Sequence, residues 1–183
     1  MPMCLKSHYV DSQDKLLLLI GYENGDLRLI QCVFGQPQSI YIEQSVKLHD
    51  QPVIDIDYFT ISNVSEYMIK GYCVSVNDKL SNFVVDRDFR LVDCTNNTTN
   101  TYLKQLPYSS CTTVRVRQDG KFFVVGFWNG KMYVYSAKSY KLLCILNSGD
   151  VTCASFANPQ DCHGTDRYLA CGSAIPLPNC HSY

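Results

Sequence analysis

The chain has 183 residues with a formal net charge of −1, and hydrophobic residues make up 46% of it. This length allows one domain with a sizeable core. The near-neutral charge predicts no direct binding to nucleic acid or to an acidic membrane surface. No apolar run reaches the roughly 18 residues that span a bilayer, and the N-terminus lacks the apolar core of a signal peptide. The ten cysteines are therefore expected as free thiols in a reducing compartment.

The first part of the chain predicts three strands after a weakly structured start. Residues 1–15 supply at most one weak strand. Residues 16–21 are a continuous apolar run, residues 22–25 are a turn, and residues 26–31 alternate between apolar and polar side chains. A third strand is expected over residues 39–48.

The next unit is less regular. Residues 53–58 alternate as a first strand should, and residues 67–76 and 82–86 are expected as the second and third strands. The run DCTNNTTNT at residues 93–101 is polar and turn-prone, so we expect a loop there. Residues 102–106 are expected as the fourth strand.

The clearest strand pattern covers residues 121–146. It contains three apolar or aromatic strands, and Asn129-Gly130 between the first two is typical of a tight hairpin whose two turn positions both need a positive φ. A strand over residues 112–117 and a turn at residues 118–120 precede it. Four strands joined by tight turns within about 35 residues have the dimensions of one β-propeller blade.

A ten-residue hairpin pattern occurs twice in the chain. The sequence GYENGDLRLI, starting at Gly21, matches GFWNGKMYVY, starting at Gly126, in its glycine, aromatic, Asn-Gly and apolar positions. Two unrelated hairpins are the alternative, because Asn-Gly is common wherever strands turn. The third strand that follows each copy favours a repeat of blades.

A last unit begins near residue 150, with strands expected over residues 151–156 and 168–172. The tail AIPLPNCHSY has two prolines and no strand pattern, so this blade keeps two strands of four. We therefore predict an all-β β-propeller fold, a partial ring of about four blades, two of them incomplete. The expected units are an N-terminal segment (1–15), a partial blade (16–48), an irregular blade (49–111) with its polar loop (93–101), the best-defined blade (112–149), a truncated blade (150–173) and a non-propeller tail (174–183).

These motifs resemble WD repeats of the G-protein β-subunit-like kind. The stretches IGYENGDLRLIQC and HDQPVIDIDY, with the run over residues 112–146, resemble in order and spacing the C-terminal half of the ASTRA-associated WD-repeat family and its animal G-protein β-like relatives. The resemblance covers roughly residues 15–173. It implies a β-propeller that works as a protein scaffold.

The resemblance also implies a structural network. In such repeats a His before the first strand, a hydroxyl in the second strand and an Asp in the next turn form a buried hydrogen-bond network, and His49, Ser75 and Asp78 match these places. The Trp-Asp pair that names the repeat is absent, because the equivalent places hold Ile-Gln at 30–31 and Tyr-Ser at 135–136.

The chain supplies about half of a propeller. Seven blades need about 300 residues at ~40–45 each, so we expect a truncated or mis-spliced gene product, with a naturally short chain as the alternative. A half ring leaves two apolar blade faces open, because each blade buries its faces against neighbours. We expect a second copy or a partner to cover these faces, or the chain to aggregate.

Three cysteines and two histidines gather near the C-terminus: Cys162, His163, Cys171, Cys180 and His181. Zinc sites usually show paired cysteines with two to four residues between them, and no such pair occurs here. Core and tail thiols are the preferred interpretation. We expect no metal and no cofactor.

Two pairs of charged residues share strand faces. Asp55 and Asp57 match the carboxylate pair of a glycosidase, but solvation at a strand end is the preferred interpretation. Arg115 and Arg117 are expected to hydrogen-bond within or beside the central channel rather than to bind nucleic acid, since the chain is slightly acidic.

Two functional classes follow. The first, which we adopt, is a non-catalytic interaction scaffold, with Trp128 in its hairpin turn as a candidate partner contact, because Trp is favoured in binding hot spots. Packing of Trp128 on its own blade is the alternative. The resemblance implies ASTRA subunits as partners, work in chromatin remodelling and in the maturation of phosphatidylinositol-3-kinase-related protein kinases, and location in the nucleus, with the cytoplasm as a second compartment. The second class is a hydrolase with its site at the channel mouth.

Overall fold

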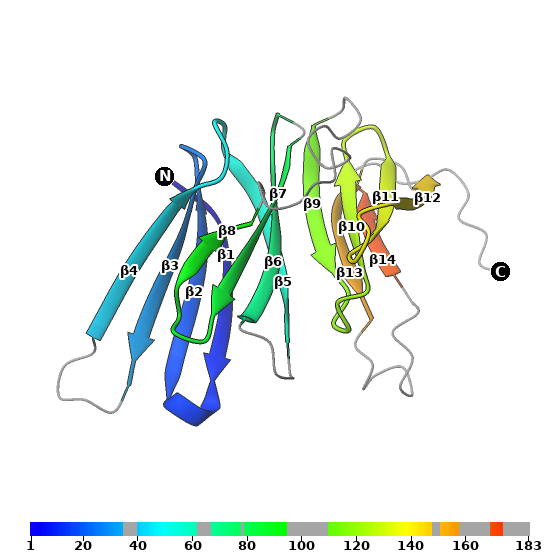
Figure 1. The fold of residues 1–183 in the computed structure, drawn as a ribbon. Helices are drawn as coiled ribbons and strands as arrows, with labels where there is room; N and C mark the ends of the chain where they lie inside the picture. The colour runs from blue at the N-terminus through cyan, green and yellow to red at the C-terminus, as the bar shows by residue number, and fades with distance from the viewer. Residues whose placement is uncertain are drawn as a thin grey trace.

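The computed structural model describes residues 1–34, 40–61, 67–77, 79–94, 110–147, 151–157 and 169–173. These ranges form four antiparallel β-sheets that stand side by side as blades (Figure 1). The one helical element among them is the short 3-10 turn η1 (Asp11–Gln13), and nothing helical there has the length or apolar character to cross a membrane. The predicted all-β, partial β-propeller fold is confirmed.

The blades are numbered in chain order, and their strands are as follows. Blade 1 consists of β1 (Pro2–Val10), β2 (Lys15–Tyr22), β3 (Asp26–Val33) and β4 (Ile40–Lys47). Blade 2 consists of β5 (Val53–Thr60), β6 (Tyr67–Ser75), β7 (Leu80–Asp86) and β8 (Leu91–Asp93). Blade 3 consists of β9 (Cys111–Val116), β10 (Phe122–Phe127), β11 (Lys131–Ser136) and β12 (Leu142–Asn147). Blade 4 has two described strands, β13 (Val151–Phe156) and β14 (Leu169–Ser173).

The first strand of each blade is its inner strand. In every four-stranded sheet the spatial order follows the chain, and β1, β5, β9 and β13 contact one another in succession. This row of inner strands, with the remaining strands fanning outward, is the arrangement around a propeller channel (Figure 1).

Strand β1 corrects the expectation of a weak strand before residue 16. It pairs with β2 over nearly its whole length, so blade 1 has four strands. The half-buried face of this strand mixes apolar and polar residues. Lys6 and His8 lie on it between Cys4 and Val10 and reach toward blade 2, whereas Leu5 and Tyr9 lie on the exposed face.

The fourth strand of blade 2 is β8, directly after β7. Leu91 pairs with Val85 and Asp93 with Phe83, so blade 2 already has its four strands at Asp93, where the polar run 93–101 begins. Residues 102–106, predicted as this strand, lie outside the described residues, as does the tail at 174–183.

Three hairpin turns share a geometry that differs from the prediction. At Gly25, Gly120 and Gly130 the glycine alone has a positive φ, of +86°, +66° and +76°, whereas we expected both positions of Asn-Gly to need one. Each glycine N–H donates to the carbonyl three residues earlier. The Asn or Asp before each glycine accepts the N–H of the residue after it. This is a turn closed by a glycine bulge, in which the Asn contributes an acceptor.

Every inner strand carries a β-bulge at the same place. The register with the second strand skips Met3 in β1, Ile54 in β5, Thr112 in β9 and Thr152 in β13. Each skipped residue lies opposite the end of the second strand. Four equivalent bulges identify all four blades as repeats, including the two in which the sequence shows no hairpin match.

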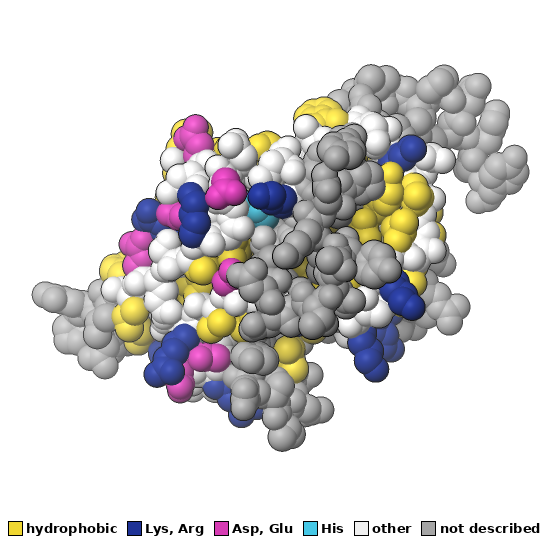
Figure 2. All heavy atoms as spheres, turned by 45° about the horizontal axis from the view of Figure 1, so that its top comes forward, with side chains coloured by type: hydrophobic (Ala, Val, Ile, Leu, Met, Phe, Trp, Pro, Cys, Tyr) yellow, Lys and Arg dark blue, Asp and Glu magenta, His cyan; other side chains and the backbone are white. Residues whose placement is uncertain are grey.

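Apolar side chains fill the joints between blades. Blades 1 and 2 share Leu17, Leu19, Leu29, Ile69 and Phe83, blades 2 and 3 share Tyr72, Val74, Val114 and Phe123, and blades 3 and 4 share Val124, Met132, Val151 and Ala154. Large apolar side chains stay exposed on the free face of blade 1 and on β12, and Figure 2 shows such patches at the surface. Of the two open blade faces expected of a partial ring, the described residues show apolar side chains on the free face of blade 1.

Two outer turns insert an aromatic residue into the preceding blade. Phe89 and Tyr140 both have a positive φ, of +59° and +57°, and both side chains are buried. The Phe89 carbonyl accepts side-chain N–H groups of Gln31 and Gln44 from blade 1, at 3.0 and 2.7 Å. Tyr140 Oη accepts the Asn82 side-chain amide of blade 2 at 3.2 Å. These contacts offset the left-handed backbone, which costs about 1–3 kcal/mol for a residue other than glycine.

The turn at Gly25 tests how tightly blade 1 and blade 2 are joined. A Cβ at this position meets the His49 carbonyl oxygen at 2.0 Å, and φ is +86°. Gly25→Ala is therefore expected to lower the free energy of unfolding by more than about 2 kcal/mol. Urea denaturation followed by circular dichroism measures this. Glu23→Ala in the same turn is the control and changes the free energy by less than about 0.5 kcal/mol; equal denaturation midpoints for the two variants contradict the close approach.

Candidate functional site

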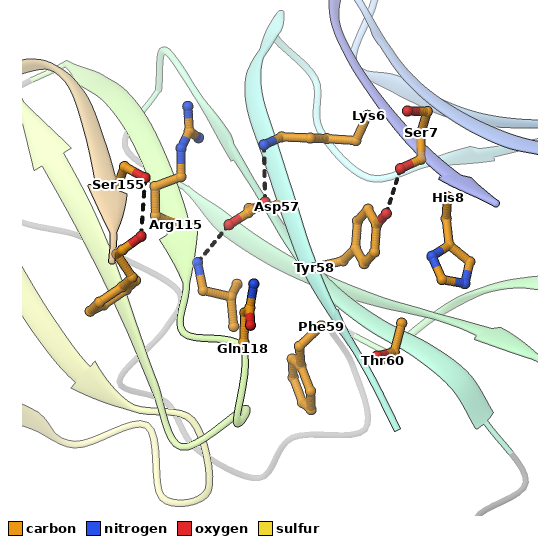
Figure 3. A pocket seen from close by; sticks show the side chains of 12 residues that line it. Lys6, Ser7, His8, Asp57, Tyr58, Phe59, Thr60, Arg115, Gln118 and Ser155 are labelled. Carbon is orange, nitrogen blue, oxygen red and sulfur yellow. Dashed lines mark hydrogen bonds and ion pairs between the residues drawn. The ribbon is translucent and has the colours of Figure 1, made fainter. Parts of the chain in front are cut away.

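An open cavity of about 710 Å³ lies along the inner strands, where a propeller has its channel (Figure 3). All four inner strands line it, through residues such as Lys6 of β1, Asp57 of β5, Arg115 of β9 and Ser155 of β13. In Figure 3 the Lys6 ammonium reaches from blade 1 across to Asp57 on blade 2. The cavity is thus a shared feature of the blades rather than part of any one of them.

The charges at the cavity are paired between blades. Lys6 Nζ lies 3.1 Å from Asp57 Oδ1, and the Arg115 guanidinium forms an ion pair with Asp55. Burial lowers the pKa of His8, which also lines the cavity, below its usual 6.5. Two positive and two negative groups cancel, so the cavity has no strong field to select a charged ligand.

The two aspartates also hold the inner edge of blade 3. Asp55 Oδ2 accepts the N–H of Val114 at 3.0 Å and the hydroxyl of Thr113 at 2.7 Å. Asp57 Oδ2 accepts the N–H of Val116 at 2.7 Å. The acceptors are two residues apart on β5 and the amide donors two residues apart on β9. The aspartates are therefore a joint between blades, which corrects the preferred interpretation of a solvated strand end.

The two arginines have different surroundings. Arg115 lies beside the cavity, as expected. Arg117 binds Asp119 at 2.6 Å within the turn after β9, and this hydrogen bond lowers the pKa of the Asp119 carboxyl. The Arg117 guanidinium also lies over the Phe122 ring, 4.3 Å from its centroid.

His49 and Ser75 are both buried where blade 1 meets blade 2. His49 Nε2 lies 3.3 Å from Cys73 Sγ, and burial lowers the pKa of His49 to about 4. Burial also raises the pKa of the Cys73 thiol, so this contact joins a neutral imidazole and a neutral thiol. Within the described residues His49 Nδ1 and Ser75 Oγ have no hydrogen-bond partner. Asp78 lies outside those residues, so the network of His49, Ser75 and Asp78 stays a prediction.

Trp128 lies at the tip of the β10–β11 hairpin and is 53% exposed. Its backbone N–H donates to the Ser110 carbonyl at 3.2 Å. Glu23, at the equivalent position of blade 1, donates to the Met1 carbonyl at 2.9 Å in the same way. The backbone thus fixes both turns alike, and about half of the indole surface faces solvent.

Lys6 and the edge of β9 were not predicted from the amino-acid sequence. The only signal was the spacing of the charges, with Asp at 55 and 57 and Arg at 115 and 117. That spacing becomes informative only when β5 and β9 are known to lie side by side, which no local pattern indicates.

No three His, Cys, Asp or Glu side chains gather to hold a metal ion in the described ranges. Of the C-terminal candidates, Cys171 is exposed on β14, whereas Cys162, His163, Cys180 and His181 lie outside those ranges. The inter-blade joints and the Trp128 hairpin are therefore the features from which a function can be argued.

Equivalent four-stranded blades around a shared channel define a partial β-propeller, and the sequence is similar to WD-repeat proteins, as its motifs predicted. It is 27% identical to guanine nucleotide-binding protein subunit beta-like protein 1 of Mus musculus, over 94% of this chain and 46% of that protein. It is also 27% identical to ASTRA-associated protein 1 of Schizosaccharomyces japonicus, over 76% of this chain and 37% of the relative, and to that of Verticillium alfalfae, over 81% and 34%. The chain spans between about a third and just under half of these relatives. No protein-family model matches it.

The lowered pKa of His49 predicts acid sensitivity. In the unfolded chain the imidazole binds a proton below about pH 6.5, whereas the folded protein resists protonation down to about pH 4. The free energy of unfolding should therefore fall by about 2 kcal/mol between pH 7.5 and 5 through His49 alone. Urea denaturation at several pH values measures the slope. His49→Gln should be less stable at pH 7.5 but flatter with pH, and an unchanged slope in this variant refutes the assignment.

The carboxylate joint predicts a specific loss of stability. Asp55→Asn keeps one carbonyl oxygen but loses the negative charge that binds Arg115. The neutral amide is also a weaker acceptor for the Thr113 hydroxyl and the Val114 N–H of β9. We expect the free energy of unfolding to fall by about 1–3 kcal/mol. Asp50→Asn, an exposed carboxylate beside Lys79, is the matched control and should change it by less than about 1 kcal/mol. Equal effects of the two substitutions, measured by chemical denaturation, count against the joint.

Proposed function

We propose that this chain is a non-catalytic scaffold that binds other proteins, and that Trp128 is one of its contacts. The exposed indole on a fixed hairpin is the observation that carries the proposal. A Trp side chain offers a large apolar surface with a donor N–H, which makes it a frequent hot spot in protein interfaces. Because the turn is held by backbone hydrogen bonds, little order has to be gained when a partner binds.

The pairing of the carboxylates at the cavity favours a scaffold over a hydrolase. General acid–base catalysis needs a carboxyl group free to exchange a proton with substrate. Asp55 and Asp57 instead accept hydrogen bonds from β9 and pair with Arg115 and Lys6. Their role in joining blades accounts for their position without a reaction.

Similarity to proteins named ASTRA-associated protein 1 supports a more specific assignment. We infer that the partners are subunits of the ASTRA assembly and that the chain serves chromatin remodelling and the maturation of phosphatidylinositol-3-kinase-related protein kinases. The expected location is the nucleus, with the cytoplasm as a second compartment. The His49, Ser75 and Asp78 network is proposed to hold blade 2 for this role.

Affinity purification tests the function and the contact together. The tagged chain, its Trp128→Ala variant and the matched hairpin variant Glu23→Ala are each purified from cell extract, and bound proteins are quantified by mass spectrometry. We expect ASTRA subunits with the wild type and with Glu23→Ala, and a loss of more than about tenfold with Trp128→Ala.

The outcomes separate the two parts of the proposal. Recovery of ASTRA subunits by all three proteins supports the scaffold and rejects Trp128 as its contact. Recovery of chaperones alone, with a circular dichroism spectrum that lacks β-structure, rejects the scaffold.

A further inference from the structure

Outer strands differ in how they are protected against pairing with another chain. Strand β4 carries charged groups in ion pairs, Arg28 with Glu43 and Lys47 with Asp26. Strand β8 has only three residues. Charges and short length are two of the means by which proteins keep sheet edges from pairing with one another. Strand β12 uses neither.

Strand β12 is exposed along its whole length. All six residues of its sequence LLCILN are exposed, and none of them is charged. Leu143 is 51% and Ile145 46% exposed, and the residues before and after each of them in the sequence are also apolar. Among the described residues, blade 4 provides two strands and blade 2 ends in the short β8, so neither neighbouring blade has a long fourth strand beside β12.

The outer edge of β12 has backbone groups available for pairing. Ser136 N–H donates to the Lys141 carbonyl at 3.0 Å, so this residue of β11 turns its backbone toward β12. Val134, two residues earlier, does the same and pairs with Cys144. Alternation then directs the N–H and C=O of Ile145 away from β11, to the edge of the sheet that no other described strand pairs with.

We propose that β12 pairs in antiparallel fashion with β12 of a second copy of this chain, centred on Ile145. A bulge at Leu143 interrupts the register with β11, so the regular part of the edge is residues 144–147 and the centre lies within it. In this register Ile145 faces Ile145 of the second copy, and Cys144 faces its Leu146. Two blade-3 sheets thereby become one continuous sheet of eight strands. This interaction is separate from the Trp128 contact.

The sequence of the strand suits self-pairing in this direction. Lys141 is the charged residue that precedes the strand, and antiparallel symmetry places the two copies of it at opposite ends of the joint. A parallel pair would set them side by side. Apolar cross-strand pairs each stabilise a sheet by about 0.2–1 kcal/mol, and Ile145 and Cys144 with Leu146 provide three such pairs. The twofold axis closes the assembly at two chains.

Molar mass in solution tests the proposal. Size-exclusion chromatography with light scattering should give twice the chain mass of 20.8 kDa in the micromolar range, and the monomer on dilution. Ile145→Lys places like charges opposite one another and should weaken the dimer by more than about tenfold. Leu5→Lys is the matched control, because Leu5 is 58% exposed on the open face of blade 1. It should leave the dimer intact.

Two further measurements locate the contact. Hydrogen exchange of the peptide containing Ile145 should slow with rising concentration, while peptides from β1 keep their rates. In a Cys144→Ser background, oxidation by diamide should link Ile145→Cys to its copy, since opposed residues of a hydrogen-bonded pair lie about 5.5 Å apart between Cα atoms. Leu143→Cys, which faces Asn147 of the second copy, should not link to itself.

Each alternative result overturns the proposal. A wild-type monomer throughout the concentration range rejects self-association. A dimer broken by Leu5→Lys but not by Ile145→Lys assigns association to blade 1. Binding of a foreign protein at β12 without a dimer replaces the second copy by another partner. Circular dichroism of each variant verifies that it is folded.

Discussion

Two carboxylates hold blade 3 to blade 2 by accepting hydrogen bonds from backbone N–H groups that have no partner strand. Inner strands of neighbouring blades lie side by side without pairing, so their edge N–H groups need acceptors from side chains. Asp55 and Asp57 provide them to Val114 and Val116. A buried amide left without an acceptor costs about 1–3 kcal/mol. The neutral cavity and the apolar joint beside it both depend on the spacing that these bonds set.

The sequence predicted the fold well where the hydrophobic pattern was local. Alternating strands and the two matching hairpins indicated consecutive blades, and Gly25 and Gly130 indicated their turns. It was least informative at β1, where Lys6 and His8 share the half-buried side with Cys4 and Val10 because they contact the next blade. Such a mixed face gives only a weak hydrophobic pattern.

The candidate site was less accessible to prediction than the fold. The place of Trp128 in a hairpin turn was predictable because Asn129 and Gly130 encode the turn locally, whereas its role as a partner contact stays a proposal. The pairing of Arg115 with Asp55 joins strands 60 residues apart in the chain, and no local signal specifies that distance. The hydrogen-bond network expected around His49 stays a prediction; His49 is buried, and its observed neighbour is the Cys73 thiol, whose weak polarity gives no sequence signature.

The buried aromatic residues of two outer turns always insert from a later blade into the one before it. Phe89 of blade 2 enters blade 1, and Tyr140 of blade 3 enters blade 2, so each insert belongs to the later blade and each receptor to the earlier one. A ribosome makes the receptor first. As the chain emerges, both of these outer turns can therefore pack on a blade that has already been made, so each of the two blades can dock on its predecessor without waiting for the next one.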